Sequence, residues 1–82
     1  MKKVLYFGRL ADVTGMMEER LELPAKIETA GALREWLDAR FGHTGVLLDP
    51  TVRVAIDSEI TIDSTPIVTA EEIAFMPPVG GG

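Results

Sequence analysis

The chain has 82 residues, 46% of them hydrophobic, which is enough for one compact domain and too few for two. A formal net charge of −5 disfavours a nucleic-acid partner and favours a basic protein surface. The absence of cysteine excludes disulfides, thiolate metal sites and a cysteine nucleophile, and we expect no bound metal. Apolar runs are short and the N-terminus leads directly into a strand pattern, so we expect no membrane span, no signal peptide and a cytoplasmic location.

The first third of the chain predicts a hairpin. Residues 2–9 have the β-branched and aromatic content of a strand, and residues 17–23 alternate apolar with charged positions. Residues 10–16 contain an aspartate and a glycine and predict a loose turn between the two strands. Pro24 ends the second strand, because proline has no amide hydrogen to donate.

One helix is predicted after the hairpin. Thr29 can cap its N-terminus, an apolar stripe at helical spacing runs to about Phe41, and Gly42 supplies the C-terminal stop. Residues 43–50 predict a loop with a short helical turn at 46–48. The remaining strands are predicted at 51–57, 60–62 and 72–76.

The order ββαβββ predicts a two-layer α+β domain of β-grasp, or ubiquitin-like, form, with one mixed sheet and one main helix packed on one face. A ferredoxin-like sandwich is the alternative, but it requires a second comparable helix, and the 43–50 loop is too short for one. We therefore expect a β-grasp domain over residues 1–76 and an extended tail over residues 77–82.

Alternation assigns the strand residues to two faces of the sheet. The helix side is predicted to hold Val4, Tyr6, Leu21, Leu23, Val52, Val54, Ile56, Ile73 and Phe75. The opposite face is predicted to hold Leu5, Phe7, Ala55, Ala74 and Met76, with Ile60 at its rim. Such an apolar patch on a small domain indicates a partner surface, unless a loop or a second small core covers Leu5 and Phe7.

The last six residues predict a tail that leaves the domain. Pro77 and Pro78 must end the strand that arrives at Met76, and Val79 leads into Gly80, Gly81 and Gly82. Glycines without Cβ can thread a channel too narrow for other side chains, and six extended residues reach at most about 20 Å. The tail therefore suits delivery of the Gly82 carboxylate into a partner's active site. A frayed terminus is the plain alternative.

Three segments together resemble a known family, the small, sulfur-carrying subunit of molybdopterin synthase. KVLYFGRLADVTG at 3–15 resembles its opening strand and turn, VRVAID at 52–57 its third strand, and EEIAFMPPVGGG at 71–82 its closing signature. The chain departs from the family where Met76 replaces an aromatic residue, where Asp57 replaces a common asparagine, and where Ala70 and Glu71 replace a Gly-Asp turn.

The resemblance implies a sulfur carrier that has no enzymatic activity on its own and binds no cofactor. Gly82 would be adenylated by an E1-like enzyme that uses ATP, converted to a thiocarboxylate, and inserted into the larger synthase subunit to sulfurate a pterin precursor. The complex would be a heterotetramer. Leu5, Phe7, Ile60 and Met76 would contact the partners, while Pro77, Pro78, Val79, Gly80 and Gly81 would thread the partner's active site.

Three other functions fit a terminal diglycine on this fold: a ubiquitin-like protein modifier, a thiamine-type sulfur carrier and a plain interaction domain. His43, alone in a loop, predicts a solvated side chain rather than a ligand or general base. The adjacent carboxylates Glu18 and Glu19, and Glu71 and Glu72, point to opposite strand faces and do not converge on a substrate.

Overall fold

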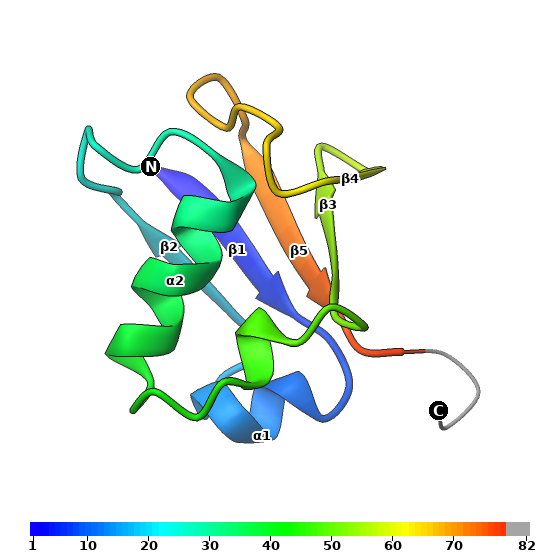
Figure 1. Ribbon diagram of the computed structural model, residues 1–82. Coiled ribbons are helices and arrows are strands. Elements are labelled where there is room, and N and C mark those ends of the chain that lie inside the picture. The colour runs from blue at the N-terminus through cyan, green and yellow to red at the C-terminus, as the bar shows by residue number, and fades with distance from the viewer. Residues whose placement is uncertain (79–82) are drawn as a thin grey trace.

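A computed structural model describes residues 1–78. One five-stranded sheet, in the order β2-β1-β5-β3-β4, carries helix α2 (Ala30–Arg40) across one face (Figure 1). The strands are β1 (Lys2–Tyr6), β2 (Glu18–Leu21), β3 (Arg53–Ile56), β4 (Glu59–Thr61) and β5 (Glu72–Met76). The central pair β1 and β5 is parallel, and the other pairs are antiparallel. The predicted β-grasp architecture is confirmed.

The predicted hairpin contains a short helix in place of a turn. The first strand ends at Tyr6 rather than Arg9, because Gly8 takes a φ of +55° and turns the chain. A short helix, α1 (Leu10–Thr14), then replaces the expected loose turn, and Leu10 is fully buried in the hydrophobic core. The second strand is also shorter than predicted, covering residues 18–21.

Helix α2 begins where the sequence predicts. The Thr29 side-chain oxygen accepts a hydrogen bond from the Ala32 amide at 3.2 Å, which satisfies one free amide of the first turn. The amides of Ala30 and Gly31 donate to the carbonyls of Thr65 and Asp63 at 3.0 and 2.9 Å. The loop that follows β4 therefore closes over the start of the helix.

Gly31 lies in close contact with the loop at this end of the helix. A Cβ at this position would lie 3.0 Å from the Asp63 Cβ and 3.2 Å from its carbonyl oxygen. The predicted short turn after the helix is the 3₁₀ helix η1 (Val46–Leu48).

The core lies between the sheet and α2. The strand residues assigned to the helix side all belong to it or pack against it, so that prediction is confirmed. Tyr6 stacks on Phe75 with ring centroids 5.9 Å apart and meets Phe41 edge to face at the same distance. The turn before β5 needs no glycine conformation: Ala70 is buried and its carbonyl accepts a 2.7 Å hydrogen bond from Lys2 Nζ.

A charged cluster joins β2 to the end of α2. The Tyr6 hydroxyl donates to Glu19 Oε2 at 2.6 Å, and Arg40 donates to both Glu19 carboxylate oxygens at 3.1 Å. Burial raises the pKa of Glu19, but the hydrogen bonds from Arg40 and Tyr6 outweigh it and hold that pKa below its usual value of 4.5. Burial and the bond to Glu19 raise the pKa of Tyr6.

This cluster predicts that acid destabilises the domain. The lowered pKa of Glu19 contributes stability that is complete above pH 4.5 and is lost as the pH falls through the folded-state pKa. We expect Glu19→Gln to flatten the dependence of unfolding free energy on pH between pH 5 and pH 3, measured by urea denaturation. The exposed Glu22→Gln serves as control. An equal effect of the two substitutions would contradict the prediction.

Candidate functional site

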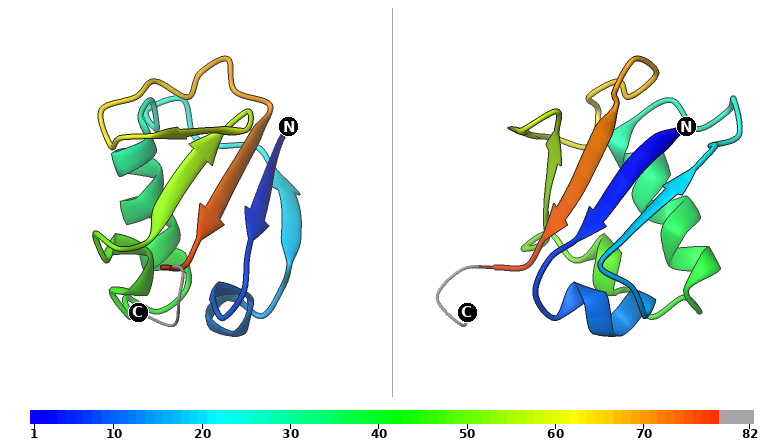
Figure 2. Two further views of the ribbon diagram at one scale, coloured as in Figure 1. Left: turned by 90° about the vertical axis from the view of Figure 1, so that its right-hand side faces the viewer. Right: turned by 180° about the vertical axis from the view of Figure 1, so that it is seen from behind.

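The sheet face away from α2 carries an uncovered row of apolar residues. Leu5, Ala74, Ala55 and Ile60 are successive register partners across β1, β5, β3 and β4. Figure 2 shows this face of the sheet without a covering helix. We call Leu5, Phe7, Ile60 and Met76 the open-face patch.

The open-face patch is smaller than the sequence predicts. Phe7 is 47% exposed and Ile60 is 63% exposed, whereas Leu5 and Met76 are half-buried. Ala55 and Ala74 point to this face but are only 7% and 6% exposed, because larger residues neighbour their short methyl groups in the row. The assignment of these residues to the sheet face away from α2 is confirmed. The expectation that Ala55 and Ala74 form part of a solvent-facing patch is wrong. Binding of a partner to this face stays a prediction.

The tail begins at one end of this patch. The Phe7 amide donates to the Phe75 carbonyl at 3.0 Å, which fixes the end of β1 beside the end of β5. Gly8, at a φ of +55°, faces Pro77 so closely that a Cβ would lie 3.0 Å from the proline Cγ. The chain therefore leaves the sheet against the β1–α1 turn (Figure 1). Val79, Gly80, Gly81 and Gly82 lie outside the described residues.

A hollow of about 350 Å³ lies beside the root of the tail. It is lined by Pro50, Thr51, Arg53, Pro77 and Pro78. Register explains why segments so far apart in the chain meet here, because Arg53 on β3 pairs with Met76 on β5. Pro77 and Pro78, the first two tail residues, thus form one wall of this hollow. Strand β3 and the loop before it form the other wall.

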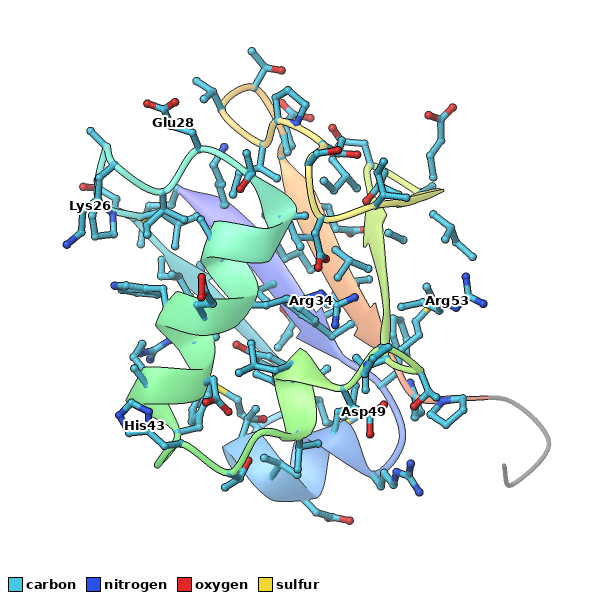
Figure 3. All side chains as sticks on the ribbon, in the orientation of Figure 1. Lys26, Glu28, Arg34, His43, Asp49 and Arg53 are labelled. Atoms are coloured by element: carbon cyan, nitrogen blue, oxygen red, sulfur yellow. The ribbon has the colours of Figure 1, made fainter. Side chains whose placement is uncertain are left out.

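A buried arginine holds the loop that forms the other wall. Arg34 reaches from α2 toward this loop (Figure 3) and donates to the carbonyls of Leu47 and Val52 at 2.9 and 2.6 Å. Its Nε lies 2.9 Å from Asp63 Oδ1, close enough for an ion pair but outside hydrogen-bond geometry. Arg34 was not among the predicted site residues; its position directly after Leu33, a residue of the apolar helical stripe, was the available signal.

The remaining candidates form no site. His43 is exposed, and its Nδ1 lies 4.0 Å from Asp38 Oδ2. Glu19 faces Arg40 while Glu18 is exposed, so this pair does not converge. Within residues 1–78, no three histidine, aspartate or glutamate side chains are placed to hold a metal ion. No helix in that range is long and apolar enough to cross a membrane.

The open-face patch predicts a binding defect for Phe7→Ala. Because the ring is about half exposed, truncation removes an interface anchor rather than a core side chain. We expect partner affinity to fall by about 1–3 kcal/mol, which is roughly 5- to 150-fold, while the unfolding free energy changes less. Titration calorimetry measures the change in partner affinity, and thermal unfolding of the same variant measures the change in stability. A sharp fall in thermal midpoint with unchanged affinity would contradict the assignment of Phe7 as an anchor.

Comparison with known proteins gives matches along the whole chain. The sequence pattern of the ThiS family matches residues 4–82. The molybdopterin synthase sulfur carrier subunit of Escherichia coli is 30% identical over the full length of both chains. The human protein of the same name is 30% identical, and the match covers 98% of this chain and 92% of that one.

A solved structure supports the fold. The small archaeal modifier protein 1 of Haloferax volcanii superposes with a TM-score of 0.78 at 20% identity, over 99% of this chain and 98% of that one. At this identity the likeness concerns the fold alone. The sequence matches are stronger and extend to residue 82. The chain therefore belongs to the ThiS family, together with the sulfur carrier subunits of molybdopterin synthase.

Proposed function

We propose that this chain is the sulfur carrier subunit of a molybdopterin synthase and that its Gly82 carboxylate carries the sulfur. One observation carries the proposal: the similarity to subunits of that name spans both chains from end to end. The described structure is compatible with it, since β5 ends at Met76 and two prolines direct the chain out of the sheet at the edge of the open-face patch.

The chemistry needs activation, because a carboxylate of pKa about 3.5 is ionised at neutral pH and is a poor electrophile. A Gly82 carboxylate oxygen attacks the α-phosphorus of ATP and pyrophosphate leaves. A sulfur nucleophile at the oxidation level of hydrosulfide then displaces AMP and leaves a thiocarboxylate. In the synthase the thiocarboxylate sulfur attacks a carbon of the pterin precursor and displaces an oxygen leaving group, which forms a thioester. Water then attacks the Gly82 carbonyl carbon and breaks its bond to sulfur, so the sulfur stays on the pterin and the Gly82 carboxylate is regenerated. The carrier itself binds no cofactor and is not catalytic alone.

Two partners must receive the same tail in turn. An E1-like enzyme binds ATP and activates Gly82, and the larger synthase subunit accepts the thiocarboxylate, in a heterotetramer of two copies each. Both would dock on the open-face patch, because Phe7 and Met76 lie beside the tail root. We therefore expect the two partners to compete for the carrier.

Intact-mass measurement tests the proposal. The carrier is incubated with an E1-like enzyme of a molybdopterin pathway, ATP and sulfide, and replacement of one oxygen by sulfur adds about 16 Da. Oxidation of any of the four methionines adds nearly the same mass, so fragmentation must place the change on Gly82. An unchanged Gly82 would contradict the proposal. Linkage of Gly82 to lysines of other proteins would favour a protein modifier.

A further inference from the structure

Two exposed arginines flank the root of the tail. Arg53 stands opposite Met76 in the sheet and lines the same hollow as Pro77 and Pro78. Figure 3 shows it extending outward from β3. Arg9 directly follows Gly8, which lies against Pro77 on the other side. Neither arginine has an ion-pair partner within residues 1–78.

Two exposed positive charges, on Arg9 and Arg53, adjoin the tail root of a chain that is acidic as a whole. The chain carries −5, and Asp49 is an acidic neighbour in this region: its carboxylate accepts hydrogen bonds from the Thr51 amide and hydroxyl at 2.8 and 2.7 Å and stays ionised, so it offsets one of the two arginine charges. These bonds, and to a smaller extent the charges of Arg9 and Arg34, lower the pKa of Asp49. Arg9 thus lies within electrostatic reach of the loop that lines the hollow.

Both arginines also adjoin the apolar contact residues. Arg9 lies two residues from Phe7, and Arg53 pairs with Met76. A partner that covers the open-face patch would therefore exclude water from the neighbouring guanidinium groups. Interface arginines at the margin of an apolar anchor need acceptors on the partner, and carboxylates match the planar guanidinium fork.

We propose that Arg9 and Arg53 form ion pairs with carboxylates of the larger synthase subunit, at the mouth of the channel that receives the tail. The inference rests on the proposed function. It assigns to the partner an acidic channel mouth, although the net charge of the carrier by itself favours a basic surface. The arginines act as positioning residues, because they set the entry of the tail and do not reach the reacting carboxylate.

The length of the tail favours carboxylates of the partner over phosphates of a nucleotide. Gly82 is the fourth residue beyond Pro78, so the reacting group can lie up to about 14 Å beyond the root. When the tail is extended in the complex, Arg9 and Arg53 therefore face the groups at the mouth of the partner's channel and not the reacting group. Binding measured without nucleotide distinguishes the two, because only the carboxylates of the partner are then present.

Arg20 provides a matched control on the same sheet face. It lines a hollow of about 520 Å³ at the other end, together with Met1, Lys3, Asp57, Ser58, Glu71 and Glu72. Replacement of any one exposed arginine by glutamate changes the net charge from −5 to −7. Arg9→Glu, Arg53→Glu and Arg20→Glu therefore differ in position and not in total charge.

The test measures association and dissociation rates of each variant with the isolated larger subunit, without nucleotide, from 0.1 to 1 M salt. We expect Arg9→Glu and Arg53→Glu each to weaken affinity about tenfold or more, and most at low salt, while Arg20→Glu changes it less than twofold. Sulfur transfer at saturating carrier should persist in Arg20→Glu, whereas Arg9→Glu and Arg53→Glu should need a higher carrier concentration to reach half of their maximal rate. Circular dichroism checks that each variant is folded.

Equal or tighter binding of the Arg9 and Arg53 variants relative to Arg20→Glu would overturn the inference and show that net charge governs association. Normal binding without nucleotide, combined with a defect only when ATP and the activating enzyme are present, would also overturn it in favour of phosphate contacts. These outcomes leave the proposed function intact. Failure of the unmodified carrier to bind the larger subunit would instead contradict the proposed function.

Discussion

Removal of Gly81 and Gly82 is expected to abolish sulfur transfer and to leave the folded domain unchanged. The core lies between α2 and the sheet, β5 ends at Met76, and the tail contacts described for the domain involve Pro77 and Pro78. The truncated chain would present a carboxylate two residues short of the position that the activating enzyme must reach. We expect transfer below detection in a reconstituted assay and a thermal midpoint equal to that of the full chain.

A chain extended by one residue beyond Gly82 is the control for tail length. It keeps all three glycines but replaces the Gly82 carboxylate by a peptide bond, so we expect the same loss of transfer. Both variants should still bind the larger subunit through Phe7 and Met76, although more weakly. Pterin sulfuration by either variant would show that the Gly82 carboxylate is not the sulfur-bearing group.

Replacement of Arg34 by methionine is expected to produce the largest loss of stability. The substitution leaves the buried carbonyls of Leu47 and Val52 without their donors, and an unpaired buried polar group costs about 1–3 kcal/mol. The ion pair with Asp63 adds little, because the aspartate side chain is 66% exposed. We expect unfolding free energy to fall by about 3 kcal/mol and the thermal midpoint by more than about 10 °C.

Arg53→Met is the matched control, because it removes the same side chain from an exposed position nearby. Its effect on unfolding free energy should stay within about 0.5 kcal/mol. Amide hydrogen exchange should quicken over residues 47–52 in Arg34→Met and not in Arg53→Met. Equal destabilisation by the two substitutions would show that the carbonyl contacts of Arg34 do not hold this loop.

The sequence by itself determined the strand and helix pattern and the faces of the sheet. Period-two alternation in the strands, the Thr29 cap and the helical stripe are local properties, and each is visible in a short window of residues. The prolines after Met76 likewise fixed the end of β5. Helix α1 escaped prediction because five residues are too few to show a helical period, and its start depends on a turn at Gly8 and burial of Leu10.

Only the tertiary structure decided the surroundings of the tail. Pro50, Arg53 and Pro77 meet because β3 pairs with β5, and Gly8 meets Pro77 because β1 lies parallel to β5. Burial of Ala55 and Ala74 depends on the size of their cross-strand neighbours. The role of Arg34 depends on carbonyl groups 13 and 18 residues away. Such contacts follow from strand pairing and packing between distant segments, which no local pattern of residues encodes.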